Sequence, residues 1–461
     1  MFSRDELEEV SNELSRLPHD FFDIYVEDTN NMALSLESGK IERPSTGVVF
    51  GAGIRILLNG VTYFGVVDNP CVDSLLSMCG ELKKRIKDVR SVDKGQCVVK
   101  QKQAPFEKGP WARWNQLDQV IDYLKSLDEY ARTYDAQVVQ VSCQLKQTVS
   151  QVQMINSLGN YCEEERNRTQ TLCSVYAADG DSIQTGYGVE GKFGGLELLD
   201  SVSPEYLAVN AAKMAVSKLK AVVPTSGEYP VILGPGPVGV IFHEAVGHSL
   251  EADSIRKQVS VMRGRLGEHL GSPIVTLVDS GVVPGGYGSS AFDDEGFPNQ
   301  ETVLIQEGVL VSYMSDYLEH LLIGFPHTSS GRRESYAHIP YPRMRNTYLM
   351  PGKDEYEGML SSIEKGVLVS MVGGGQVDEV TGDFIFDVIE AYLIENGRIT
   401  TPLKEVSMVG NGLTILHNVA GVSQEKDLRI VAGLCGKENQ LVPIGVGEPY
   451  LMISKIFLGG E

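Results

Sequence analysis

Long apolar stretches and a surplus of basic residues are both missing from this chain of 461 residues. No segment approaches the ~18 consecutive apolar residues of a membrane-spanning helix, so we expect no transmembrane helix and no membrane partner. Lysine and arginine number 40 against 61 aspartates and glutamates, which gives a formal net charge of −21. An acidic chain without a long basic run is repelled by phosphate backbones, so we expect no nucleic-acid partner either.

Cysteine is scarce and follows no recognisable pairing pattern. The chain has seven cysteines, and no two of them form a CxxC pair, which argues against a thioredoxin motif and a zinc ribbon. Residues 1–20 are amphipathic and charged, and they lack the apolar stretch of a signal peptide. An odd number of cysteines in such a chain indicates reduced thiols, so the expected location is the cytoplasm.

The first half of the chain contains alternating helical and strand-like patterns. Helical spacing of apolar residues predicts helices over 3–18, 71–87, 116–132 and 203–220, the last with Ser203 as its N-cap. Strand patterns fill most intervals, Asn59-Gly60 between two apolar runs predicts a hairpin, and residues 94–115 are expected to be irregular. Because a helix followed by strands occurs twice, we interpret 1–105 and 106–222 as two copies of one α+β unit.

The second half of the chain has a different composition. Proline and glycine cluster around residues 224–237, which indicates a domain boundary and divides the chain into 1–222 and 223–461. Residues 272–461 are rich in glycine and valine and are predicted to form a twisted sheet or barrel-like β domain with few helices. The expected fold class is therefore α+β, with a β-rich C-terminal domain that carries the helix described next.

The segment Phe242–His248 holds two imidazoles and a carboxylate, which are the ingredients of a zincin metal site. Zincins place their histidines four positions apart, whereas His243 and His248 are five apart and would diverge by about 140° on a regular helix. A one-residue π-bulge would restore their convergence, and Gly247 is a residue type that lets a backbone distort. We therefore predict a locally irregular helix over 243–249.

A catalytic zinc site needs three protein ligands and an open position for water. Glu251 and Asp253 follow on the same helix, and Cys435, the only cysteine of the second half, lies in a glycine-flanked segment. Each of these three residues is a candidate third ligand. Glu244 is the candidate general base that would deprotonate the water and then protonate the leaving amine. The alternative is an ordinary helix that happens to hold two histidines.

Several segments together carry a resemblance to one known family. GPVGVIFHEAVGHSLEAD, which contains both histidines, resembles the TldD/PmbA family, and specifically its metal-bearing TldD branch. The resemblance continues through FDDEG at 292–296, GRRESY at 331–336, PRMRNT at 342–347, GGG at 373–375 and GLCG at 433–436. SLESGKIE and GVVFGAGIRILLNGVTYFG in the first domain are similar to the family as well, so the resemblance covers essentially the whole chain.

This resemblance implies a zinc metallopeptidase of the U62 type. It implies that His243, His248 and Cys435 hold Zn²⁺ and that Glu244 is the catalytic base. It also implies extended or unfolded peptides as substrates and a dimer, either a homodimer or a heterodimer with a metal-free PmbA/TldE-like homologue. One departure is Arg345, where the family pattern leads us to expect threonine, and this difference would alter the local cleft.

Other polar residues are candidates for supporting roles. Six polar residues lie within a span of 15 residues and would bind substrate or stabilise an oxyanion, unless they form a structural network: Arg332, Arg333, Tyr336, His338, Arg343 and Asn346. Among them Tyr336 and His338 are the expected oxyanion donors, and Arg333 and Arg343 the expected substrate contacts. Glu251 either accepts a hydrogen bond from a ligand imidazole or faces solvent.

Two further segments have a structural and a functional interpretation. Asp293-Asp294-Glu295 is more typical of a solvated turn closed by Gly296 than of a cation site. The glycines at 373–375 lack the context of a phosphate loop, and we expect them to admit another backbone, such as that of a substrate.

The sequence therefore predicts a zinc-dependent metalloprotease that cleaves extended or unfolded peptides. The first alternative is a non-catalytic peptide-binding or regulatory protein whose metal site is structural, the class to which the older family description as a modulator of DNA gyrase belongs. The second alternative is a metal-dependent hydrolase of a small amide. Glu244 disfavours the first alternative, because a structural site has no use for a base beside its ligand.

Overall fold

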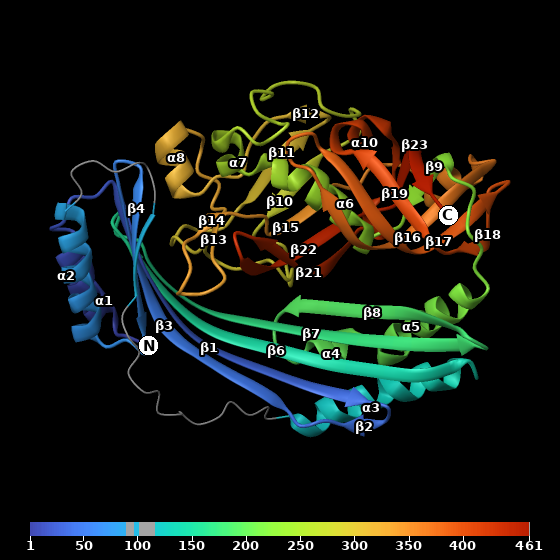
Figure 1. The fold of residues 1–461 in the computed structure, drawn as a ribbon, viewed down its shortest axis with the longest axis horizontal. Helices are drawn as coiled ribbons and strands as arrows, with labels where there is room; N and C mark the ends of the chain where they lie inside the picture. The colour runs from blue at the N-terminus through green and yellow to red at the C-terminus, as the bar shows by residue number, and fades with distance from the viewer. Residues whose placement is uncertain (89–95, 101–115, 461) are drawn as a thin grey trace.

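A computed structural model describes residues 1–88, 96–100 and 116–460 (Figure 1). The N-terminal half builds one curved eight-stranded sheet with the order β5-β4-β3-β1-β6-β7-β8, and β2 pairs with β1. Its strands are β1 (Phe21–Glu37), β2 (Lys40–Ile41), β3 (Ser45–Leu58), β4 (Val61–Asp68), β5 (Gln96–Lys100), β6 (Val138–Asn156), β7 (Tyr161–Asp179) and β8 (Ser182–Phe193). The α+β class predicted from the sequence is thereby confirmed.

Helices cover only one face of this sheet (Figure 1). These helices are α1 (Arg4–Leu14), α2 (Val72–Asp88), α3 (Leu117–Tyr134), α4 (Leu198–Ser201) and α5 (Pro204–Leu219). Along β1, Phe22 and Ile24 belong to the core shared with α1 and α2, and Leu34 and Leu36 belong to the core shared with α3 and α5. Because side chains alternate along a strand, the odd-numbered residues of β1 point to the opposite face, where the C-terminal half lies.

Local signals in the sequence correspond closely to the observed element ends. Ser203 caps α5 by accepting a hydrogen bond from the backbone of Tyr206, as predicted. Asn59 and Gly60 have positive φ angles of 52° and 77° and join β3 to β4 in the predicted hairpin. Part of the segment expected to be irregular forms a strand instead, because β5 pairs in parallel with β4. The proposed boundary between repeats at 105/106 lies outside the described residues, so the internal duplication stays a prediction.

The C-terminal half contains two sheets and short helices (Figure 1). One sheet contains β9 (Gly227–Leu233), β16 (Lys365–Val377), β17 (Asp383–Glu395), β18 (Arg398–Leu403), β19 (Val406–Asn411), β20 (Val419–Val422) and β23 (Leu451–Gly459). Five of these strands close into a ring, since β16 pairs with both β9 and β17, and β23 and β19 complete the circuit. The predicted β-rich, barrel-like domain is therefore present.

The other sheet has the order β12-β11-β10-β15-β22-β21. Its strands are β10 (Leu277–Ser280), β11 (Glu301–Gln306), β12 (Val309–Leu310), β15 (Asn346–Leu349), β21 (Arg429–Lys437) and β22 (Gln440–Glu448). The remaining elements are β13 (Gly331–Arg332), β14 (Tyr341–Pro342), α7 (Ala252–Lys257), α8 (Tyr317–Ile323), α9 (Tyr356–Ser361) and α10 (Gly412–Asn418). Within the described residues, none of the helices has both the length and the apolar composition needed to cross a bilayer.

The segment that holds the two histidines lies in the core between these sheets. Phe242, Val246 and Leu250 share one apolar cluster with residues of β9 and β16 on one side and of β10 and β15 on the other. Each of the three side chains is at most 2% exposed. Packing from both sides fixes the direction in which the imidazoles of this segment point.

Buried ion pairs join the two halves of the chain. Arg55 of β3 contacts Asp23 of β1 and Glu295 of the C-terminal half, each at 2.5 Å, and all three side chains are buried. Arg166 of β7 contacts Asp294 at 2.5 Å. The expectation of a solvated turn at 293–295 is wrong, because all three carboxylates are buried, and Asp294 and Glu295 neutralise arginines of the N-terminal sheet. Burial alone would raise the pKa of Asp294, but the charges of Arg166 and Arg345 together with its hydrogen bonds outweigh burial and lower the pKa to about 2.

Removal of the Arg55 guanidinium tests how much the buried ion pairs between the two halves contribute to the free energy of unfolding. Arg55→Ala removes the guanidinium that Asp23 and Glu295 share and leaves them with only Arg333 and His327 nearby, and breaking a buried pair in this way costs about 3–5 kcal/mol. We expect urea denaturation to show a fall of that size in the free energy of unfolding. Arg4→Ala, which breaks the exposed pair with Glu8, is the matched control and should cost less than about 1 kcal/mol. Equal effects of the two substitutions would contradict the role given to the interface.

Candidate metal centre

The segment from Val240 to Leu250 changes its helical type twice. α6 (Val240–Phe242) continues into a π-helical turn, η2 (His243–Gly247), and then into a 3₁₀ turn, η3 (His248–Leu250). The backbone N–H of His248 donates to the carbonyl of His243, five residues earlier. The predicted irregular helix is thereby confirmed, and the additional residue in the turn brings His243 and His248 to the same side.

Gly247 is required here for a reason that the sequence did not reveal. Its backbone angles, φ −60° and ψ −50°, are ordinary helical values, so the expected role in backbone distortion is wrong. A Cβ at this position would lie 2.2 Å from the sulfur of Met344. The absence of a side chain therefore allows Met344 to pack directly against the π-helical turn.

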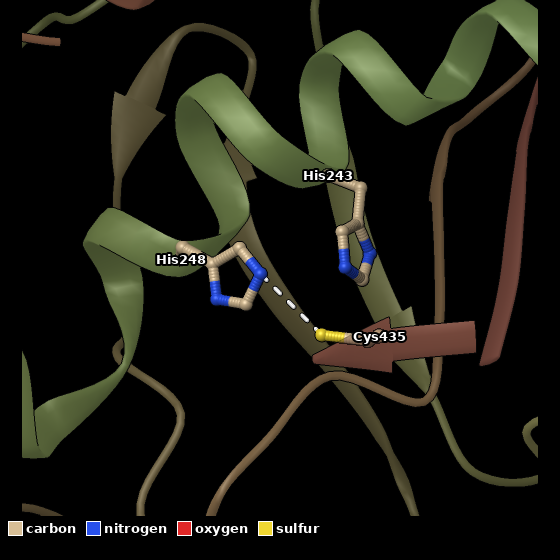
Figure 2. Close-up of side chains that lie close together, drawn as sticks. All are labelled: His243, His248 and Cys435. Atoms are coloured by element: carbon tan, nitrogen blue, oxygen red, sulfur yellow. Dashed lines mark hydrogen bonds between the residues drawn. The ribbon is translucent and has the colours of Figure 1, made fainter. Parts of the chain in front are cut away.

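The two histidines and Cys435 converge, as Figure 2 shows. The imidazole centroids lie 5.1 Å apart at an interplanar angle of 87°, and the Sγ of Cys435 lies 3.4 Å from Nε2 of His248. One ligand atom from each of the three residues lies within 4.8 Å of the others. All three side chains are buried. Cys435 belongs to β21 and lies 187 positions after His248 in the sequence.

The chemistry of this cluster suits a divalent cation. Both ring nitrogens of His243 are buried and have no hydrogen-bond partner among the described residues. Burial would raise the pKa of the Cys435 thiol, but the imidazoles of His243 and His248 outweigh burial and lower it to about 4. Two imidazole nitrogens and one thiolate form the donor set of a borderline-soft metal ion, and a bound ion would give His243 the partner it lacks.

Glu251 holds His248 from outside the cluster. Its Oε2 lies 3.1 Å from Nδ1 of His248 and also accepts a hydrogen bond of 2.8 Å from Nζ of Lys437. This contact leaves Nε2 of His248 directed at Cys435, as a carboxylate behind a ligand imidazole does. Burial alone would raise the pKa of Glu251, but Lys437 and His248 lower it to about 2. Of the two readings of Glu251, the solvent-facing one is therefore wrong.

Asp253 and Lys437 complete this support. Asp253, the other carboxylate considered as a ligand, binds Lys437 at 2.6 Å and Lys257 at 3.1 Å instead. Lys437 was not singled out from the sequence. A signal was present, because Lys437 lies two positions after Cys435 and so shares its face of β21. The lysine neutralises two buried carboxylates beside the cluster.

Glu244 is the one residue of the π-helical turn that is not buried. Its side chain is 36% exposed, and Oε2 lies 3.7 Å from Nε2 of His248. A carboxylate at that distance can reach both the cluster and solvent, which is what the position of a general base requires.

The contacts of Tyr336 and Arg333 differ from those of the oxyanion donor and the substrate contact that the sequence predicted. The hydroxyl of Tyr336 donates to Asp68 of β4, and its ring packs over Gly51, where a Cβ would lie 2.1 Å from Cε2 of the ring. Arg333 binds Asp23 at 2.8 Å and lies over the ring of Tyr25. Both residues contact the N-terminal sheet, because the 333–336 segment packs on it, and their assignment as oxyanion donor and substrate contact finds no support in these contacts.

His338 and Arg343 have structural contacts. Nδ1 of His338 lies 2.9 Å from the hydroxyl of Ser335. Arg343 is fully buried, and its Nη2 donates to the backbone carbonyl of Cys435 at 2.6 Å. Arg343 therefore positions the strand that supplies the thiol, a role that the sequence analysis did not foresee.

The glycines at 373–375 belong to β16, where its pairing with β17 is irregular. A Cβ on Gly375 would lie 2.2 Å from the ring of Phe386. It would also lie 2.8 Å from the backbone carbonyl of Ile385, so the expected close approach of another backbone is present. That backbone belongs to β17 of the same chain, and the expectation of a substrate backbone is wrong for Gly375.

The cluster has the donor set of a protein metal centre. Comparison with family models agrees along the chain: residues 22–86 match PmbA/TldA metallopeptidase domain 1, 115–219 match the central domain and 226–460 match the C-terminal domain. The chain belongs to the PmbA/TldD family of metallopeptidases.

Individual relatives agree with this assignment. The metalloprotease TldD homolog of Haemophilus influenzae is 36% identical over 454 residues, which cover 96% of this chain and 93% of the relative. The zinc metalloprotease TldD homolog of Saccharolobus solfataricus is 32% identical over 266 residues, 57% of this chain and 58% of the relative. The crystal structure of TldE from Thermococcus kodakarensis has the same fold, with a TM-score of 0.78, 19% identity and 99% of each chain covered.

The contact between Gly247 and Met344 can be tested directly. Gly247→Ala places a methyl group against the sulfur of Met344, and such overpacking should lower the free energy of unfolding by about 1–3 kcal/mol. In a chain that already carries Met344→Ala, the same substitution should cost much less. A double-mutant cycle in urea measures the coupling, and additive effects would show that Gly247 is needed for some other reason.

Proposed function

We propose that the protein is a cytoplasmic zinc-dependent metalloprotease that hydrolyses peptide bonds in extended or unfolded peptides. The observation that carries this proposal is the buried His243, whose ring nitrogens have no hydrogen-bond partner in the described part of the chain. It lies beside a second imidazole and a low-pKa thiol, with one accessible carboxylate next to them. The name of the Saccharolobus relative supports zinc as the metal.

In the proposed mechanism His243, His248 and Cys435 hold the zinc. When bound, zinc polarises the scissile carbonyl and lowers the pKa of a water molecule. Glu244 accepts the proton of the attacking water on its carboxylate and passes it to the nitrogen of the leaving amine. Glu251 keeps His248 in the tautomer that carries the proton on Nδ1, and the packing of Phe242 and Val246 excludes water from the inner side.

The proposal includes a substrate form and a partner. An extended peptide presents its backbone to a β-rich surface, and β21, which supplies Cys435, is the outer strand of its sheet. An acidic protein that cleaves unfolded chains must limit access to its centre, so we propose that it acts as a dimer, either with a second copy or with a metal-free PmbA/TldE-like homologue. Light scattering of the purified chain, alone and with such a homologue, distinguishes these two states.

Two alternatives make different demands on Glu244 and on the substrate. A non-catalytic binding protein with a structural metal would have no need for the exposed carboxylate 3.7 Å from His248. A hydrolase of small amides would use the same residues but would act on a small amide in preference to unfolded proteins. A panel of unfolded proteins, short peptides and small amides separates the second alternative from the proposal.

Replacement of Glu244 tests catalysis apart from metal binding. Glu244→Gln keeps the size of the side chain but removes its basicity, so peptide cleavage should fall about a thousandfold while the zinc content stays unchanged. The measurements are cleavage of an unfolded protein and metal analysis of the same sample. Glu425→Gln, a change of the same kind at an exposed position, should leave both values unaltered. Cleavage at the wild-type rate by Glu244→Gln would show that the mechanism is wrong.

A further inference from the structure

A cavity of about 380 Å³ lies between the N-terminal sheet and the C-terminal half. Its walls come from the face of β1, β6 and β7 that carries no helices and from the segments around 287–294, 332–335, 345 and 434–443. Its size falls in the range of small-molecule and peptide sites. No residue of the His243, His248 and Cys435 cluster lines the cavity.

Five arginines line this cavity, and they fall into two groups. Arg166 and Arg333 have carboxylate partners in Asp294 and Asp23. The other three bind only neutral acceptors among the described residues: Arg168 donates to the carbonyls of Tyr287 and Ser289, Arg332 to those of Met344 and Pro443, and Arg345 to the carbonyl of Ser329 and the hydroxyl of Ser290.

The second group is a cluster of buried guanidinium groups that form no ion pair among the described residues, although the charge of Asp294 compensates part of theirs. Arg168, Arg332 and Arg345 are each at most 9% exposed, and Nη2 of Arg345 has no hydrogen-bond partner among the described residues. Burial, together with the charges of neighbouring arginines, lowers the pKa of all three guanidinium groups, that of Arg168 to about 10. An anion in the cavity would offset this repulsion and supply acceptors for the unused N–H groups.

The carboxylates that line the cavity do not fill this role. Asp294 is held by Arg166, and Glu27 accepts hydrogen bonds from Thr29 and from the backbone of Tyr336. Glu334 accepts one from the backbone of Leu441. Asp294, Asp293 and Asp279 compensate part of the charge of these arginines without forming an ion pair with their guanidinium groups, so a bound anion would be a direct ionic partner for them.

Part of the cavity wall is apolar. Leu434 and Leu441 line the cavity and are 60% and 55% exposed. With Pro443 they form one face of the β21–β22 pair, since Leu434 lies opposite Pro443 in the register. Cys435 points to the other face of the same pair, so the cavity and the candidate metal centre lie back to back across these two strands.

We propose that this cavity binds the carboxyl end of a peptide, with the terminal carboxylate on Arg168, Arg332 and Arg345 and an apolar terminal side chain against Leu434 and Leu441. A carboxylate matches the planar fork of a guanidinium, and an apolar side chain removes exposed leucine surface from water. The identification of the ligand as a peptide rests on the proposed function, whereas the need for an anion does not. A peptide held here runs beside β21, the strand that supplies Cys435.

Binding without cleavage tests this proposal. The zinc-loaded Glu244→Gln protein is titrated by calorimetry with N-acetyl-leucyl-leucine and with the same compound as its C-terminal amide. We expect the acid to bind at least about tenfold more tightly than the amide, because only the acid forms charge-assisted bonds to the arginines. Equal affinities, or no binding of either compound, would overturn the proposal.

Variants assign the effect to the cavity. Arg345→Gln should weaken binding of the acid about tenfold and leave the amide unchanged, Arg345→Lys should keep part of the preference, and the exposed Arg398→Gln should behave as the parent protein. Arg168→Gln provides the same test if Arg345→Gln does not fold, as judged by circular dichroism. A preference for the acid that survives in both Arg345→Gln and Arg168→Gln would contradict the assignment.

Inorganic phosphate distinguishes a peptide site from a site for free oxyanions. If phosphate competes with N-acetyl-leucyl-leucine, the result supports an anion site in the cavity. If phosphate binds and N-acetyl-leucyl-leucine does not, the assignment of the cavity to peptides is overturned. Because these titrations measure binding without cleavage, the peptidase proposal and the cavity proposal can be refuted independently of each other. If the wild-type protein does not cleave peptides while Glu244→Gln prefers the acid, the peptidase proposal is refuted. If the wild-type protein cleaves peptides while Glu244→Gln shows no preference for the acid, the cavity proposal is refuted.

Discussion

The hydrogen bond from the backbone of His248 to the carbonyl of His243 is the constraint on which the candidate site depends. In a regular helix these two imidazoles would point in different directions, and no single cation would reach both. The five-residue bond adds one residue to the turn and places the rings 5.1 Å apart. The contact of Cys435 with His248 and the support of His248 by Glu251 both require the side-chain directions that this backbone geometry sets.

The distorted turn is stable because the surrounding structure leaves it few alternatives. Two sheets pack on its apolar side chains, and Met344 occupies the space that a side chain at position 247 would take. Arg343 holds the backbone of β21 at Cys435, and Lys437 neutralises the carboxylates behind His248. The thiol and the imidazoles are thus brought together by elements far apart in the sequence.

The sequence predicted features that depend on local interactions. The histidine spacing required a π-helical turn, Ser203 marked the start of α5, and Asn59-Gly60 marked a hairpin, since each signal acts over a few residues. Features that depend on distant partners were missed or misread. Asp294 and Glu295 looked like a solvated turn because Arg166 and Arg55 lie more than a hundred positions earlier. Tyr336 looked like an oxyanion donor because nothing local indicated its contact with β4.

X-ray absorption at the zinc edge of the purified protein tests the central claim most directly. The account predicts one zinc per chain with two nitrogen ligands at about 2.0 Å and one sulfur ligand at about 2.3 Å, and it predicts loss of the sulfur signal in Cys435→Ser. A shell made only of oxygen and nitrogen atoms in the wild-type protein, or an unchanged sulfur signal in the variant, would show that Cys435 and the two histidines do not form a common metal centre.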